Sequence, residues 1–373
     1  MIEASAKVWD EVRADPYGQG CESHSGDDRN STHSDCSYST GAANQSQISP
    51  APGVILAGNS ESVPSTLRRL HARKGLAELD ALKSKISEAG LGGVAKRILE
   101  LVRPCYRIAR VLTPDEGIPI GSSRFGGSPD VSASFTWPHV SGSGKAEPME
   151  FVGQIRLSDL PEPLPESLPR DGLLSFFTRW SEASVLYSPA GTPLERATGP
   201  NPLVAPAPSG FVKRFLAELK RNPDPRQTYR SCALVFAHGL SLPDGSSSII
   251  EQMKLSRVDS ESYSELVLDP PSGGAAGEKT QHRMFGYASP VQNEMELECD
   301  FVRRNEEVQW NSSPERFISA TRDWVLLLQV DTDDYPDGPG WMWGDAGMVY
   351  FWIHREDLAA RAFDKVICIE QCH

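Results

Sequence analysis

Several features that would fix a cell compartment are missing from the sequence. The chain has no apolar run of about 18 or more residues, so no membrane-spanning helix is predicted. The N-terminal stretch MIEASAKVWDEVRADP lacks the basic start and apolar core of a secretory signal. Seven scattered cysteines, an odd number, are not typical of a disulfide framework in a chain of 373 residues. These absences predict a cytoplasmic protein with reduced thiols and no membrane contact.

Motifs for nucleophilic or metal-dependent catalysis are also absent. The chain contains no G-x-S-x-G, no H-E-x-x-H and no C-x-x-C. GGAAGEKT at 273–280 places Glu278 where a phosphate-binding loop needs its second glycine, so we interpret it as an ordinary loop. No motif therefore predicts an enzyme.

The charge balance argues against a nucleic-acid partner. The formal net charge is -13 and the pI is about 5.2, whereas binding to phosphate backbones normally requires a basic surface. One segment, 65–110, is basic, with eleven Lys or Arg against four Asp or Glu. It lacks the interleaved aromatic residues that stack on bases, so we expect a solvated or docking helical face.

Composition divides the chain into three parts. Residues 1–60 are rich in Ser, Gly, Asn and Asp and predict a disordered leader. Residues 61–103 have leucines at helical spacing and predict a basic amphipathic segment that packs on the main domain. Residues 104–373 consist of short β-like runs separated by Gly and Pro, with half 1 at about 104–240 and half 2 at about 241–373. We expect an α+β, β-rich fold with flanking helices.

The leader contains two pairs of metal-ligating residue types, in a C-x2-H and an H-x2-C arrangement. Their types suit zinc, but the spacing between the pairs is shorter than in zinc fingers. A metal site and a polar tail that happens to hold these residues both stay open, for Cys21, His24, His33 and Cys36.

The two halves of the main domain show a weak internal similarity. RFGGSP, EFVGQIRLSD and DGLLSFF in the first half are followed in the same order by MFGYASP, VLLLQVDTDD and DAGMVYFW in the second. Gln154 precedes Gly172 by the same interval that separates Gln329 from Gly347. We predict two similar strand-loop-strand units that arose by internal duplication. The matches pair Phe125-Gly126 with Phe285-Gly286 and Phe176 with Phe351.

These motifs, together with TWPHV, QHRMFGYASPVQ and MWGDAGMVYFWIHREDL, resemble the YwqG-like family, a bacterial domain of unknown function. The resemblance covers about residues 104–371. It implies an α+β, β-rich fold and carries over no catalytic residues.

Between Trp324 and His354 the sequence has no Lys or Arg, and an acidic loop joins two apolar runs. Its carboxylates offer hard oxygen ligands for calcium or magnesium, with Asp331, Asp333 and Asp345 as the candidates. The helix-loop-helix calcium pattern fails at Tyr335 and Pro336, and a solvated turn rich in aspartate is the alternative.

The same loop carries Trp341 and Trp343, and large rings beside acidic groups are typical of recognition surfaces. Each ring alone fits a core position equally well. His282 and the paired amides of Gln154 and Gln329 are further candidates for a binding site. We expect a cytoplasmic, non-enzymatic binding or protein-interaction module, for which an inhibitor or immunity-type role fits, using loop 331–347. The alternative is a divalent-metal-dependent hydrolase that uses the aspartates.

Overall fold

The computed structural model describes residues 65–142, 145–179, 181–197, 229–268 and 280–373, and the statements below refer to these residues. The leader of residues 1–60 lies outside them, together with its Cys and His pairs. Residues 273–279 of the glycine-rich loop also lie outside the described residues.

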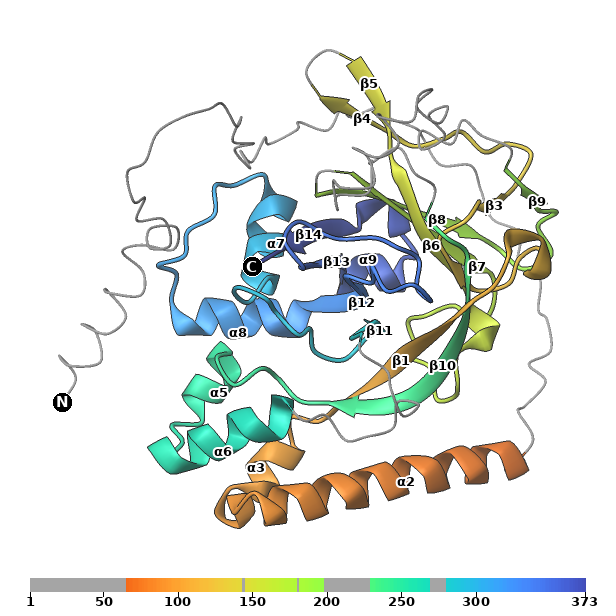
Figure 1. The fold of residues 1–373 in the computed structure, drawn as a ribbon. Helices are drawn as coiled ribbons and strands as arrows, with labels where there is room; N and C mark the ends of the chain where they lie inside the picture. The colour runs from red at the N-terminus through yellow and green to blue at the C-terminus, as the bar shows by residue number, and fades with distance from the viewer. Residues whose placement is uncertain (1–64, 143–144, 180, 198–228, 269–279) are drawn as a thin grey trace, which may run out of the picture.

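A ten-stranded antiparallel sheet is the centre of the fold (Figure 1). Its order is β14-β13-β12-β11-β1-β10-β2-β6-β7-β8, which is symmetric about the central pair. That pair consists of β1 (Arg103–Leu112) and β10 (Cys232–Ser241), joined over ten residues. The outer strands are β2 (Arg124–Phe125), β6 (Glu150–Arg156), β7 (Leu173–Arg179), β8 (Glu182–Ser188), β11 (Arg283–Met284), β12 (Trp324–Asp331), β13 (Met348–His354) and β14 (Ile367–Gln371).

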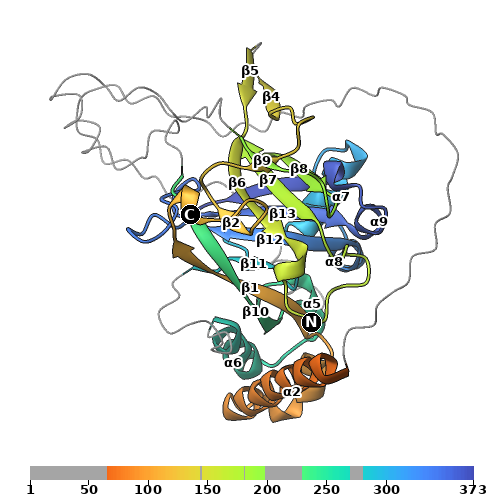
Figure 2. The same ribbon diagram turned by 90° about the vertical axis from the view of Figure 1, so that its right-hand side faces the viewer.

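The sheet curls until its two ends nearly meet, so that it encloses an interior (Figures 1 and 2). Thr178 Oγ1 of β7 lies 3.2 Å from Cys368 Sγ of β14, which shows how closely the two ends approach. Apolar side chains from both halves fill the enclosed space, among them Phe125, Phe176, Leu328 and Phe351. This buried cluster is the main core, and its apolar area is the dominant stabilising contribution.

Two loops complete this core. The loop between β6 and β7 contributes Leu160, Leu164 and Leu168, and the loop between β12 and β13 contributes Trp341 and Trp343. The connections that join the long strands of each half therefore pack against the enclosed interior instead of extending into solvent.

Helices cover the outer surface. In the second half α7 (Glu296–Arg304) and α8 (Pro314–Asp323) pack on the strands through residues such as Phe301 and Trp352. The other helices are α2 (Ser65–Glu88), α3 (Ala95–Leu99), α5 (Ser248–Gln252), α6 (Arg257–Leu268) and α9 (Arg355–Ala359). Figure 2 shows α2 and α6 on the side of the β1–β10 pair. Helices α2, α3, α5 and α6 share a separate apolar cluster.

In the first half two small strand pairs lie outside the main sheet. One joins β3 (Asp130–Val131) to β9 (Glu195–Arg196), and the other joins β4 (His139–Gly142) to β5 (Lys145–Pro148). Trp137 packs on Phe151 and Phe177 there.

The β-rich α+β expectation is confirmed. Helix α2 lies in the segment 61–103 that the leucine spacing predicts to be helical, and short β-like runs predicted within 104–373 are observed as strands, among them β6, β7, β12 and β13. The motif match of Phe125-Gly126 with Phe285-Gly286 is wrong by one residue. Arg124 pairs with Gln154 and Arg283 pairs with Gln329, so Phe125 occupies the position of Met284.

Candidate functional site

The acidic loop is fixed by a buried ion pair that begins on the central strand. Arg110 of β1 donates from Nε to Asp333 Oδ2 at 2.5 Å and from Nη2 to Oδ1 at 2.8 Å. The Asp333 side chain is fully buried and that of Arg110 is 12% exposed. A side chain at Gly338 would collide with Asp333 Oδ1, because an added Cβ would lie 2.1 Å from it. The bidentate geometry gives this pair directional strength as well as charge.

His282 completes this buried group. Its Nδ1 accepts the backbone N–H of Asp331 at 3.0 Å, and its Nε2 lies 3.4 Å from Asp333 Oδ2. The accepted bond places the ring proton on Nε2, where it faces the carboxylate. Burial favours a higher pKa for Asp333, but the contacts with His282 and Arg110 outweigh it and hold that pKa below its usual value.

Both tryptophans of the loop occupy core positions, which the sequence left open beside exposed ones. Trp341 is 0% and Trp343 is 5% exposed. Trp341 donates from Nε1 to the Asp331 carbonyl at 2.9 Å, and its ring lies 5.3 Å from those of both Phe125 and Tyr229. Both rings are part of the main core cluster. Large aromatic side chains contribute much stabilising free energy when they are removed from water.

The three aspartates proposed as metal ligands do not form a common site. Asp333 is occupied by Arg110, Asp331 Oδ2 accepts the Gln281 N–H at 2.8 Å, and Asp345 is exposed. Across the described parts of the chain, no group of three or more His, Cys, Asp or Glu is placed to hold a metal ion. In this arrangement the three carboxylates have separate partners, and calcium or magnesium binding by the loop stays a prediction.

The outer part of the loop is rigidly held but leaves carboxylates in solvent. Arg230 donates to the carbonyls of Tyr335 and Pro336. Asp337, 77% exposed at its side chain, forms a second ion pair with Arg110. Asp334 and Asp345 are exposed as well. The loop thus presents negative charge on a fixed backbone.

Gln154 and Gln329 are fully buried and make matching hydrogen bonds. Gln154 accepts the Asp130 N–H and donates to the Ser122 carbonyl, at 2.8 and 2.9 Å. Gln329 accepts the Ser289 N–H and donates to the Gln281 carbonyl, at 2.9 and 2.8 Å. Each amide satisfies backbone groups beside a two-residue strand, so both act as internal connectors in this arrangement.

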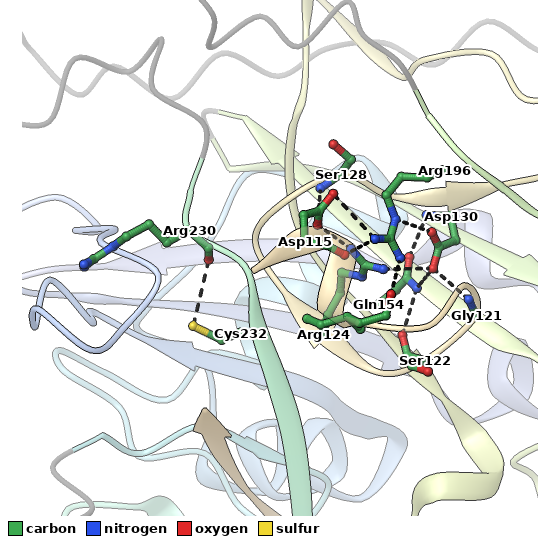
Figure 3. A network of polar contacts seen from close by, with 11 residues as sticks. Asp115, Gly121, Ser122, Arg124, Ser128, Asp130, Gln154, Arg196, Arg230 and Cys232 are labelled. Atoms are coloured by element: carbon green, nitrogen blue, oxygen red, sulfur yellow. Dashed lines mark hydrogen bonds and ion pairs between the residues drawn. The ribbon is translucent and has the colours of Figure 1, made fainter. Parts of the chain in front are cut away.

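A second buried ion network lies beside Gln154 (Figure 3). Arg124, fully buried, donates to Asp115 at 2.5 Å and to Asp130 at 3.2 Å. Arg196 of β9 donates to the other Asp130 oxygen at 2.9 Å. Figure 3 shows both guanidinium groups directed at the two carboxylates. The network attaches the loop before β2 and strand β9 to the sheet.

The sequence did not single out Arg110, Arg124 or Arg230. For Arg110 a signal existed: it follows Tyr106 and Ile108 at alternate positions of one strand, on the face that points inward. A cation at such a position requires a buried anionic partner. The partner itself, 223 residues away, could not be identified by spacing.

The nearly closed sheet and its buried ion pairs define a β-rich domain in which most of the buried polar groups described above are bonded to other parts of the protein. The chain belongs to a family described as a domain of unknown function, DUF1963, whose model matches residues 123–372. No curated protein matches the chain. None of the described helices is long and apolar enough to cross a membrane.

Proposed function

We propose that the protein is a non-enzymatic binding module that recognises a basic protein partner through loop 331–347. The observation that carries the proposal is the combination of a fixed backbone with free charge. Arg110 and Arg230 hold the loop, while Asp334 and Asp345 are exposed. A preformed charged surface loses little conformational entropy on binding and selects partners of opposite charge.

Exposed apolar side chains also lie on the two central strands. Val111 and Leu112, 55% and 44% exposed, follow Arg110 directly in β1, and Val235 on the neighbouring strand is 56% exposed. Val111 and Val235 occupy strand positions that face away from the Arg110 side chain, so the charge of loop 331–347 alone supports a protein as the partner.

Catalysis has weaker support. His282 and Asp333 have the separation of an acid-base pair, but both side chains are 0% exposed. A general base must come within hydrogen-bond reach of a substrate proton, and neither group is accessible to one in this conformation. No arrangement of the described residues favours the metal-dependent hydrolase alternative.

Charge reversal tests the binding proposal. Asp334→Lys with Asp345→Lys removes the acidic surface without touching the core, and Asp364→Lys changes an exposed aspartate elsewhere. Affinity capture followed by quantitative mass spectrometry should recover a basic protein with the wild type and with the control. The double variant should recover it at least about tenfold less, and added salt should weaken capture. Equal recovery by all three proteins would refute the role of the loop.

We also propose that the two halves of the sheet are copies of one unit. The support is positional. The Gln amides accept N–H groups at equivalent places, from Asp130 and Ser289, six residues after Arg124 and Arg283 respectively. In this proposal the first unit is β1 followed by β2, β6, β7 and β8, and the second is β10 followed by β11, β12, β13 and β14, so the second unit begins at Cys232 instead of about residue 241. β1 pairs with β11 of the second unit and β10 pairs with β2 of the first, so the first strand of each unit lies beside the other unit.

The proposal also covers the subfamily of the protein, its location in the cell and the kind of partner it binds. The motifs support YwqG-like membership within the family. The five described cysteines are all unpaired, which supports a reducing cytoplasmic location. An inhibitor or immunity-type role requires a partner with an activity to block, and assaying the captured partner with and without this protein tests it.

A further inference from the structure

Two arginines face each other on the outer side of the sheet. Arg107 of β1 and Arg283 of β11 are direct register partners in the antiparallel ladder. Side chains at such positions have Cβ atoms about 5 Å apart, and like charges there are unfavourable. Both residues are partly buried. A sheet that retains two adjacent cations needs something to offset them.

The protein's own groups around Arg283 are neutral. Its guanidinium donates to the Tyr287 carbonyl at 3.1 Å, to Gln281 Oε1 at 3.1 Å and to the Ser289 hydroxyl. Burial and, to a smaller extent, the charge of Arg107 lower the pKa of Arg283. The cation is thus hydrogen bonded but not neutralised.

Arg107 has even fewer contacts. Throughout the ranges that the structure describes, its side chain makes no hydrogen bond and no ion pair. Its Nε lies 3.0 Å from where a Cβ on Gly239 would be, so the missing side chain of that glycine leaves room for the guanidinium. The Arg107 guanidinium therefore has space beside Gly239 but no hydrogen-bond acceptor among the described residues.

The ionisable groups nearest to the arginines do not supply the missing charge. Cys105 lies beside them, but burial raises the pKa of its thiol and keeps it neutral. Asp331 accepts the Gln281 N–H, and Glu78 is bound to His238 at 2.7 Å. Among the described residues, neither carboxylate lies within ion-pair distance of Arg107 or Arg283.

The equivalent register position in the first half of the sheet has a different arrangement of charges. There Arg124 faces Ala233 instead of an arginine, and it forms ion pairs with Asp115 and Asp130. Asp130 and Ser289 are matched by their N–H bonds to Gln154 and Gln329. At the equivalent positions the second half has an additional cation, Arg107, and a serine, Ser289, in place of the carboxylate of Asp130. This contrast points to a charge supplied from outside.

We propose that Arg107 and Arg283 form a binding site for the phosphate group of a small soluble molecule. A guanidinium presents donors in a planar fork that matches phosphate oxygens, and two forks on adjacent strands can share one tetrahedral dianion. The site uses the outer face of β1 and β11. It does not include Asp334 and Asp345, the exposed carboxylates on which the proposed protein interaction rests, so the two proposals can fail independently.

Three variants test the site by isothermal titration with inorganic phosphate, with acetate at matched ionic strength as the competing anion. Arg107→Gln should weaken phosphate binding at least about tenfold, because one of the two forks is lost. Arg257→Gln, which alters a side chain that is 91% exposed on α6, should bind as the wild type does. Acetate should bind much more weakly than phosphate.

Ser289→Asp is the decisive variant. It introduces the carboxylate that Arg124 has in the other half, so it should abolish phosphate binding and raise the melting temperature in phosphate-free chloride buffer. If the arginines served only the fold, Ser289→Asp could change the melting temperature but would not change phosphate binding. Unchanged phosphate binding in Arg107→Gln or Ser289→Asp, or equal binding of acetate, would overturn the proposal.

Discussion

Gln154 and Gln329 perform the same task on opposite sides of one sheet. Each accepts a backbone N–H through Oε1 and donates from Nε2 to a carbonyl that precedes a two-residue strand, at distances of 2.8 to 2.9 Å. Two buried amides thus fix the approach of both short strands, β2 and β11, to the long strands beside them. Their role is to satisfy backbone groups, and a mutation tests that role directly.

Gln154→Leu and Gln329→Leu should each lower the free energy of unfolding by about 2–4 kcal/mol, because each removes two hydrogen bonds between a fully buried amide and the backbone. Urea denaturation of the two variants should give similar losses. Gln309→Leu, at an exposed position, is the matched control and should change little. A large difference between the two core variants would contradict the equivalence of the amides.

The sequence predicted these strands well because their signals are local. Runs such as Val325 to Val330 combine apolar, β-branched and aromatic residues with flanking turn residues, and the observed strands follow them closely. The bulges in β6 and β12 also fall at comparable places, before Gly153 and Leu328.

The pairing of β1 with β11 could not be predicted from the sequence. β1 and β11 are far apart in sequence, and nothing in either strand encodes its partner. The position of loop 331–347 was missed for a related reason. Its aspartates predict a solvated turn, but Arg110 lies opposite Asp333 only after the sheet has closed, and Trp341 then replaces solvent with core. The long-range ion pair of Arg110 with Asp333 therefore determines where the loop lies, and the polar sequence of the loop does not.

Asp333→Asn should destabilise the protein by about 3–5 kcal/mol, since it leaves the nearly buried Arg110 cation without a full countercharge. The pKa of Asp333 is lowered in the folded state, so its contribution is present above the unfolded pKa of about 4 and is lost as pH falls below that value. Chemical denaturation of wild type and variant at pH 7 and at pH 3 should therefore show a gap that narrows in acid.

The control for this measurement is Asp337→Asn, which removes the exposed partner of the same arginine. Surface ion pairs contribute little, so its stability should follow that of the wild type at both pH values. A constant gap between wild type and Asp333→Asn down to pH 3 would show that the carboxylate charge is not what stabilises the loop.

Trp341→Ala should lower the free energy of unfolding by about 3–5 kcal/mol, because a fully buried ring is replaced by a cavity. Trp310→Ala removes a partly exposed ring and should lower it by less. Thermal and urea unfolding measure both. If Trp341→Ala were as stable as the wild type, the ring could not be closing the core, and a role in contacting a partner would regain support.

Glu298 of α7 should give the opposite pH dependence to Asp333. Burial raises the pKa of Glu298 to about 7, so the folded state binds a proton more tightly than the unfolded state does. Stability should therefore fall as pH rises from about 4 through 7. Glu298→Gln removes this penalty, and at pH 8 it should be more stable than the wild type by about 1–3 kcal/mol, with a smaller difference at pH 5.

Glu307→Gln, at an exposed position just beyond the helix, should give the wild-type profile. A stability advantage of Glu298→Gln that did not shrink on acidification would mean that ionisation of this carboxyl is not its cause.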